Sequence, residues 1–124
     1  MDVRTLNGLT LAYIGDSVYE TYVRRHMVNL GHTKVNSLHK QVIKYTSGGA
    51  QANIIHQLIN DGILTEKEIT IYKRGRNSSV NTSRKNISLR EYLDATGFEA
   101  LIGFLYLSGN IVRLEEIISI ILKW

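Results

Sequence analysis

Apolar residues recur along most of the chain at steps of three and four residues, the spacing that places them on one side of an α-helix. The pattern first covers about residues 6–30 and ends at Gly31, with a break near Gly15 as the alternative to one continuous helix. Because the chain contains no proline, clusters of Gly, Asn and Ser are the main interruptions. The pattern therefore predicts an all-α fold that opens with a long helix.

Single polar residues mark where further helices should begin. Thr33 is the expected N-cap of a helix that ends at Tyr45. Ser47 should cap the next helix, which runs to about Asn60, and Asn110 should cap the last one. These side chains cap because their oxygen accepts a hydrogen bond from an N–H that the first turn leaves without a partner.

Two sequence pairs match the capping box, in which a Ser or Thr and a Glu three residues later bond to each other's backbone. The pairs are Thr65 with Glu68 and Ser88 with Glu91. The first opens a helix that passes Tyr72 and ends at the RGRN sequence, and the second opens one that runs to Gly109. In total we expect about six helices in a single domain over residues 1–124.

Composition fits a folded protein rather than a disordered chain or a membrane protein. Apolar residues make up 44% of the chain and charged residues 21%. The absence of cysteine excludes disulfides and thiolate metal sites, and the chain opens with no signal-peptide pattern. No stretch reaches the roughly 18 unbroken apolar residues of a membrane helix. We therefore expect a cytoplasmic protein with no membrane partner.

Positive charge indicates the class of partner. Fifteen Lys and Arg against eleven Asp and Glu give a formal net charge of +4, which favours polyanions because phosphate binding releases counterions. Residues 74–85 are rich in cations and polar side chains, so we expect an exposed basic loop that contacts the backbone of double-stranded RNA. The side chains assigned to these contacts are Arg74, Arg76, Asn77, Arg84 and Lys85. A solvated loop without a ligand is the alternative.

Two acids stand out because each lies in an otherwise apolar helical run: Asp16 in LAYIGDSVYE and Glu99 in ATGFEALIGFLYL. An ionised carboxylate on an apolar face needs a cation, a hydrogen-bond network or a metal. Mg²⁺ is a natural candidate, since it takes oxygen ligands and often only one or two carboxylates. The alternatives are an N-cap or a salt bridge to Arg24 or Arg25 for Asp16, and a buried ion pair for Glu99.

Glycines accompany both acids. Gly15 precedes Asp16, and Gly97 and Gly103 stand on either side of Glu99. Small residues at these positions allow a helix or a substrate to approach closely. Tight crossing of two helices is the simpler interpretation, and close approach of a substrate is the alternative.

Two segments resemble a known enzyme family. LAYIGDSVYETYVRR, which contains Asp16, resembles the signature segment of the ribonuclease III family. TGFEALIGFLYLSG, which contains Glu99, resembles the second active-site helix of that family. The two segments stand in the family's order, RGRN lies between them, and no double-stranded-RNA-binding domain follows. The whole chain is therefore similar to the Mini-III branch, in which the catalytic domain stands alone.

The resemblance implies an activity and a substrate. It predicts a ribonuclease III-type endonuclease domain that forms a homodimer, with two sites along a basic valley that each cut one strand of double-stranded RNA. The products would carry 5′-phosphate and 3′-hydroxyl ends. The implied substrate is a precursor of large-subunit (23S) ribosomal RNA, and a ribosomal protein that presents it is a further partner left open. For the dimer contact we expect the apolar residues 101–107 or the last helix.

The resemblance also assigns the site residues. The family's active-site Asp and Glu fall on Asp16 and Glu99, which would be catalytic and would bind Mg²⁺, with Mn²⁺ as a substitute. The typical family has two further acids, at the positions of Ala12 and Thr96 in this chain. This departure motivates an alternative function, a catalytically silent RNA-binding or ribosome-associated module on the same fold. A metal-dependent nucleotide phosphohydrolase is a third hypothesis, but the basic segment is larger than one nucleotide requires.

Overall fold

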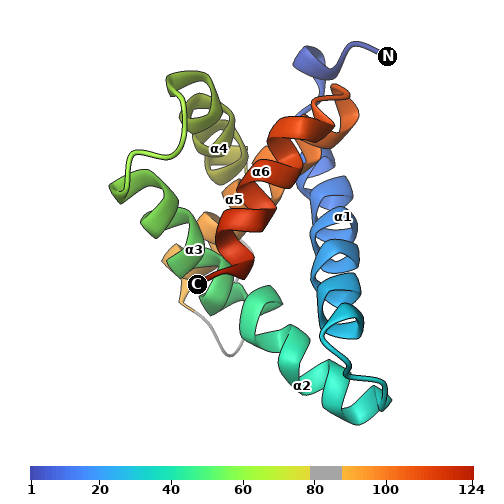
Figure 1. Cartoon of the computed structure of the whole chain (residues 1–124). Coiled ribbons are helices and arrows are strands. Elements are labelled where there is room, and N and C mark those ends of the chain that lie inside the picture. The colour runs from blue at the N-terminus through green and yellow to red at the C-terminus, as the bar shows by residue number, and fades with distance from the viewer. Residues whose placement is uncertain (79–87) are drawn as a thin grey trace.

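The computed structural model describes residues 1–78 and 88–124 (Figure 1). Within these residues it shows a short 3-10 helix, η1 (Val3–Thr5), and six α-helices. The α-helices are α1 (Gly8–Asn29), α2 (Val35–Thr46), α3 (Gly48–Asn60), α4 (Glu66–Ser78), α5 (Leu89–Leu107) and α6 (Ile111–Leu122). The predicted all-α fold is confirmed, and α1 runs without a break through Gly15. None of the described helices is both long enough and apolar enough to cross a membrane.

Local capping chemistry explains where several helices begin. Ser47 accepts a hydrogen bond from the N–H of Ala50 at 3.2 Å, as its predicted role at the start of α3 requires. The two predicted capping boxes also form, at Thr65 with Glu68 and at Ser88 with Glu91. These starts could be predicted because a cap depends on residues close together in the sequence.

Two predicted caps differ from the structure. The residue before α2 is Lys34 rather than Thr33, and its side chain makes no capping hydrogen bond within the described residues. Asn110 does precede α6, but its side chain makes no capping bond in the described part of the chain either. Tertiary packing holds these helices instead, because Val42 of α2 and Leu114 of α6 are buried in the core.

The fourth helix is longer than the sequence predicts. We expected it to end at RGRN, with an exposed loop from there on, whereas α4 continues through these residues to Ser78. Packing is the reason. A Cβ atom on Gly75 would lie 2.3 Å from the Cβ of Ala100 in α5, and a Cβ atom on Gly8 of α1 would lie 2.7 Å from the Cα of Gly75. The end of α4 is therefore fitted closely against α1 and α5. The rest of the predicted loop, residues 79–85, lies outside the described residues.

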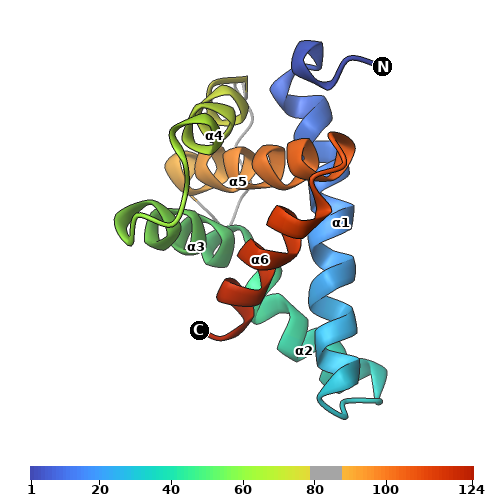
Figure 2. The ribbon, with the colours of Figure 1, turned by 45° about the horizontal axis from the view of Figure 1, so that its top comes forward.

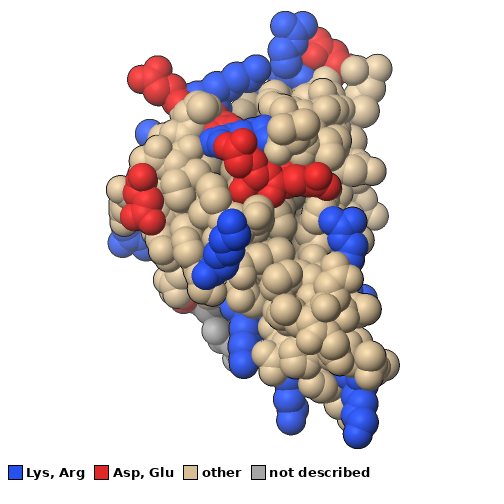
Figure 3. All heavy atoms as spheres, viewed as in Figure 1, with Lys and Arg blue, Asp and Glu red and all other residues tan. Residues whose placement is uncertain are grey.

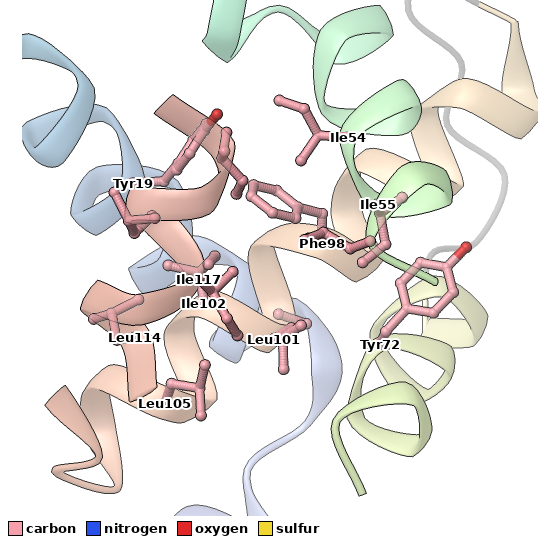
Figure 4. Close-up of a cluster of buried hydrophobic side chains, with 14 of the residues drawn as sticks. Tyr19, Ile54, Ile55, Tyr72, Phe98, Leu101, Ile102, Leu105, Leu114 and Ile117 are labelled. Carbon is pink, nitrogen blue, oxygen red and sulfur yellow. The ribbon is translucent and has the colours of Figure 1, made fainter. Parts of the chain in front are cut away.

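Helix α5 forms the centre of the molecule. In Figure 2 it runs between α4 above and α3 below and crosses α1, and α6 lies across it in the view of Figure 1. Its side chains Phe98, Leu101 and Ile102 are fully buried in the core (Figure 4). Tyr19 of α1 packs edge to face on Phe98, with the ring centroids 4.9 Å apart. A polar residue on α5 is therefore held in place by the closely packed side chains around this helix.

The apolar faces expected at a dimer contact are largely used inside the subunit. Leu101 and Leu105 of α5 are 0% and 3% exposed, and the apolar stripe of α6 is buried as well. Side chains that are buried in their own core cannot also meet a partner. The expected contact is therefore wrong for these residues, and on the two helices a partner could reach only exposed side chains such as Tyr106 and Val112.

Candidate active site

Helices α1 and α5 touch backbone to backbone at the two candidate acids. A Cβ atom on Gly15 would lie 1.7 Å from the carbonyl oxygen of Glu99, and one on Gly103 would lie 1.9 Å from that of Leu11. Any side chain at either position would push the helices apart, so both positions require glycine. The predicted tight crossing is confirmed, and it places the backbone of Asp16, the neighbour of Gly15, beside that of Glu99.

The two acids differ in exposure. Asp16 is exposed at the edge of the crossing, and Glu99 is half-buried. The expectation of an apolar surrounding is therefore wrong for Asp16, because its side of α1 is turned away from the core. Arg24, one of its alternative partners, forms an ion pair with Glu20 at 3.2 Å. Asp16 is thus accessible to a ligand from outside the chain.

Small neutral side chains fill the positions of the family's two further acids. Ala12 and Thr96 are 6% and 5% exposed and stand one turn before Asp16 and Glu99. The hydroxyl of Thr96 donates to the carbonyl of Tyr92 at 2.9 Å. Among residues 1–78 and 88–124, no group of three His, Cys, Asp or Glu is arranged to hold a metal. Neither Ala12 nor Thr96 therefore supplies a carboxylate to a metal at the crossing.

Sequence reasoning missed a third polar residue at this site. Gln51 of α3 is 2% exposed, and its Nε2 donates to the carbonyl of Thr46 at 3.3 Å and to the carboxylate of Glu99 at 3.5 Å. Its Oε1 is buried and has no hydrogen-bond partner among the described residues. The signal that could have identified Gln51 is its place between Ala50 and Ala52 in an otherwise small and apolar stretch.

The types of side chain at the crossing suit Mg²⁺. Asp16 and Glu99 contribute carboxylates from adjacent helices, and the amide of Gln51 contacts Glu99. Mg²⁺ takes oxygen ligands, keeps several of its waters and commonly binds one or two carboxylates together with substrate phosphates. Mn²⁺ accepts the same kinds of donor. The residues present are therefore suited to a hydrated Mg²⁺ rather than to a metal enclosed by protein ligands.

The predicted RNA-binding cations at the end of α4 have partners within the chain. The guanidinium of Arg74 donates to two carbonyls in residues 4–6, and Nε of Arg76 donates to Asp94 at 2.7 Å. Asn77 is exposed. Two of the predicted residues lie outside the described part of the chain, Arg84 and Lys85. Arg74 and Arg76 therefore contribute to the fold, whatever else they bind.

The end of α4 meets α5 close to Glu99. A Cβ atom on Gly75 would lie 3.2 Å from the Cα of Gly97 and 3.4 Å from the carbonyl oxygen of Thr96. Gly97 and Thr96 are two and three residues before Glu99. The structure therefore brings the backbone of the basic helix end and the acidic helix crossing to the same part of α5.

A second acid on α5, Asp94, is enclosed by donors. It is 2% exposed and accepts hydrogen bonds from the hydroxyl of Tyr72 (2.8 Å), Nε of Arg76 (2.7 Å) and Nε2 of His56 (2.7 Å). Burial alone would raise the pKa of Asp94, but these three hydrogen bonds hold it below its usual value. Burial and the bond to Asp94 raise the pKa of Tyr72 to about 12. Asp94 is thus an ionised structural group that ties α3 and α4 to α5.

Both the sequence and the fold match known proteins. The Ribonuclease III domain matches residues 9–110 of the chain. Mini-ribonuclease 3 of Streptococcus pneumoniae is 46% identical over 119 residues, which cover 96% of this chain and 93% of that protein. Mini-ribonuclease 3 of Enterococcus faecalis is 46% identical over 122 residues, which cover 98% and 92% of the two chains. A crystal structure of a Fusobacterium nucleatum protein aligns with a TM-score of 0.86 and 33% identity, over 98% and 96% of the two chains.

These matches confirm the resemblance inferred from the two acidic segments. The matched domain contains both Asp16 and Glu99, and the matches to the relatives extend over nearly the whole chain. The chain belongs to the ribonuclease III family of endoribonucleases, in its Mini-III branch.

Proposed function

We propose that the chain cleaves double-stranded RNA as an Mg²⁺-dependent endonuclease, with Asp16 and Glu99 as its catalytic and metal-binding residues. The observation that carries this proposal is the contact of Gly15 with the backbone of Glu99, which sets the two acids on crossing helices. The exposure of Asp16 supports it, because a duplex can reach that side chain without any opening of the fold.

The chain's own residues bind and position, and water is the nucleophile. When bound, Mg²⁺ polarises the scissile phosphate and lowers the pKa of a coordinated water. Asp16 and Glu99 would hold the ion through their carboxylate oxygens. Mn²⁺ substitutes because it accepts the same donors. No covalent intermediate on the chain is needed.

Recognition of the duplex rests on contacts with its backbone. Double-stranded RNA hides its base edges in a deep major groove and is bound mainly through phosphates and 2′-hydroxyls. The residues proposed for these contacts are Arg74, Arg76, Asn77, Arg84 and Lys85. Support comes from Arg76, whose side chain is 34% exposed and is fixed by Asp94. A guanidinium that is already oriented loses little freedom when it binds a phosphate.

A homodimer supplies one site for each strand of the duplex. We propose that outward-facing apolar side chains of α1 form part of the subunit contact. Leu9 and Tyr13 are 45% and 79% exposed and stand four residues apart, so they share one side of the helix. Large exposed apolar side chains that gather on one face commonly mark a contact surface. This face adjoins Asp16, which would bring the partner close to the active site.

The natural substrate that we propose is a precursor of the large-subunit (23S) ribosomal RNA in the cytoplasm. Support comes from the similarity to Mini-ribonuclease 3 proteins and from the formal net charge of +4, which favours a polyanion. In this proposal residues 1–124 act as one catalytic domain. A ribosomal protein that presents the RNA is a further partner to test.

The test is to incubate the purified chain with an end-labelled, fully paired RNA duplex in Mg²⁺, in Mn²⁺ or in EDTA. We expect internal cuts with 5′-phosphate ends in either metal, no cuts in EDTA, and no cutting of the separated strands. Duplex binding without cleavage in both metals would contradict the proposal and favour the silent RNA-binding module. Turnover of free nucleotides in place of the duplex would favour a phosphohydrolase.

A further inference from the structure

The amide of Gln51 is held in one orientation by its neighbours. Its Nε2 lies between two acceptors, the carbonyl of Thr46 at 3.3 Å and the carboxylate of Glu99 at 3.5 Å. If the amide were turned over, Oε1 would face both of these oxygens, and three acceptors would meet without a proton between them. The donor side of the amide is therefore committed to Thr46 and Glu99.

The acceptor side of the same amide is left without a partner. Gln51 is 2% exposed, and its Oε1 is buried with no hydrogen bond among the described residues. Buried amide oxygens in proteins are nearly always bonded, so one that is not indicates a donor from outside the described residues. The amide contacts the candidate metal ligand Glu99, which identifies the metal site as the source of that donor.

We infer that Gln51 is a positioning residue of the metal site, an assignment that rests on the proposed function. Its Nε2 holds the carboxylate of Glu99, and its Oε1 accepts a hydrogen bond from a water of hydrated Mg²⁺. Mg²⁺ keeps several waters, and residues that bond to such waters or to the ligands tune the site. Gln51 thereby compensates in part for the missing acids at Ala12 and Thr96.

The test compares Gln51→Met, which keeps the length of the side chain but removes both hydrogen bonds, with Gln51→Glu. The matched control is Gln57→Met, at an exposed position of the same helix. Binding of Mn²⁺ in the absence of RNA is followed by electron paramagnetic resonance, and duplex cleavage is measured against Mg²⁺ concentration. We expect Gln51→Met to weaken Mn²⁺ binding and raise the Mg²⁺ midpoint about tenfold or more. Gln51→Glu should raise that midpoint as well, because a carboxylate cannot donate to Glu99 and would face the oxygens of Glu99 and Thr46.

A purely structural Gln51 would give a different result. Gln51→Met would then lower the thermal unfolding midpoint while Mn²⁺ binding and the Mg²⁺ midpoint stayed equal to those of Gln57→Met, which overturns the inference. If Gln51→Met does not fold, an unchanged Mg²⁺ midpoint in Gln51→Glu overturns it equally. Absence of cleavage by the wild-type chain would instead contradict the proposed function.

A separate observation concerns the distribution of charge. Residues 21–60 contain no Asp or Glu, yet they hold five of the fifteen Lys and Arg and all four histidines. The five cations are all exposed: Arg24, Arg25, Lys34, Lys40 and Lys44. In the view of Figure 3, Lys and Arg side chains but no Asp or Glu side chains surround α2, in the lower part of the molecule. Outside this segment the eleven acids outnumber the ten remaining Lys and Arg, so the net positive charge of the chain comes from residues 21–60.

This basic surface is joined to the active-site face of α1. Asp16, Glu20 and Arg24 follow one another at four-residue steps, so they lie on the same side of the helix. Arg24 of α1 and His39 of α2 line one hollow between these helices. Lys34 and Lys40 line another. A helix rises about 1.5 Å per residue, which puts Arg24 roughly 12 Å along α1 from Asp16.

From this continuity we also propose that α2 and the end of α1 contact phosphates of the duplex beside the cleavage position, a proposal that likewise rests on the proposed function. The test measures duplex affinity against salt concentration in the Glu99→Gln background, with Lys40→Ala/Lys44→Ala beside the control Lys67→Ala/Lys123→Ala. We expect the slope of log affinity against log salt to fall by about two for the first pair and to stay constant for the control. Equal slopes overturn the proposal. Absence of any duplex binding would contradict the proposed function itself.

Discussion

Asp94 and Glu99 stand five residues apart on α5, yet their surroundings differ. Asp94 is 2% exposed and accepts hydrogen bonds from a hydroxyl, a guanidinium and an imidazole of its own chain. Glu99 is half-buried, contacts the neutral amide of Gln51, and lies at the crossing that carries the exposed Asp16. The difference separates an acid enclosed by donors of its own chain from the two acids that we propose as functional, of which one is exposed and one is half-buried.

Glu68 resembles Asp94 in this respect. It is 7% exposed, accepts hydrogen bonds from Arg113 at 2.8 Å, and closes the capping box with Thr65. Burial would raise the pKa of Glu68, but the bonds from Arg113 and Thr65 hold it below its usual value. Asp94 and Glu68 therefore both connect helices through hydrogen bonds. In this respect they differ from Asp16 and Glu99 at the crossing.

Loss of the Asp94 charge should have the largest effect on stability. Asp94→Asn leaves the guanidinium of Arg76 and the imidazole of His56 without a carboxylate. We expect the free energy of unfolding to fall by about 2–3 kcal/mol. This is at the low end of the loss expected when a buried ion pair is broken, because the side chains of Arg76 and His56 both reach solvent. Urea denaturation measures this loss. Asp16→Asn is the matched control and should change stability by less than about 0.5 kcal/mol; equal losses in the two variants would remove the distinction.

A side chain at the crossing should damage both stability and function. The Cβ atom of Gly15→Ala would lie 1.7 Å from the carbonyl oxygen of Glu99, so α1 and α5 must move apart. We expect a loss of about 1–3 kcal/mol in stability and a fall of about 100-fold in cleavage, because the two acids lose their spacing. Gly49→Ala is the control, since among the described residues its Cβ would meet only the movable side chain of Glu91, at 3.2 Å. Full activity in Gly15→Ala would show that the spacing is not needed.

The pH dependence of stability should sharpen the same contrast with a smaller effect. The folded-state pKa of Asp94 is lowered, so its contribution is present above its unfolded pKa of about 3.9 and is lost as pH falls through the folded value. We therefore expect wild-type stability to decline below about pH 5, and to decline less steeply in Asp94→Asn. Urea midpoints between pH 6 and pH 3 measure both slopes. Parallel curves would show that Asp94 is not ionised in the fold.

Local sequence signals predicted most of the fold. The capping boxes at Thr65 and Ser88 and the cap at Ser47 were correct, because a cap needs only neighbouring residues. The end of α4 could not be predicted, since RGRN stays helical through the fit of Gly75 against Ala100. Contacts between helices decide where such a helix ends, and the sequence of one segment does not reveal these contacts.

The candidate site was predicted in part. Both acidic segments were identified, but an acid in an apolar run was not enough to tell an enclosed carboxylate from an open one, as Asp16 shows. Asp94 is more buried than Glu99 and was passed over, because its partners come from α3 and α4. Gln51 was missed for a similar reason: its proximity to Glu99 exists only once α3 packs on α5.

The most direct test of the account compares Asp16→Asn and Glu99→Gln with the wild-type chain for duplex cleavage in Mg²⁺, duplex binding and urea unfolding. Both substitutions remove one charge and keep the shape of the side chain. The account predicts that each lowers cleavage at least about 100-fold, while duplex binding and the unfolding midpoint stay close to those of the wild type. Retained cleavage in either variant would contradict the assignment of Asp16 and Glu99 as the catalytic pair.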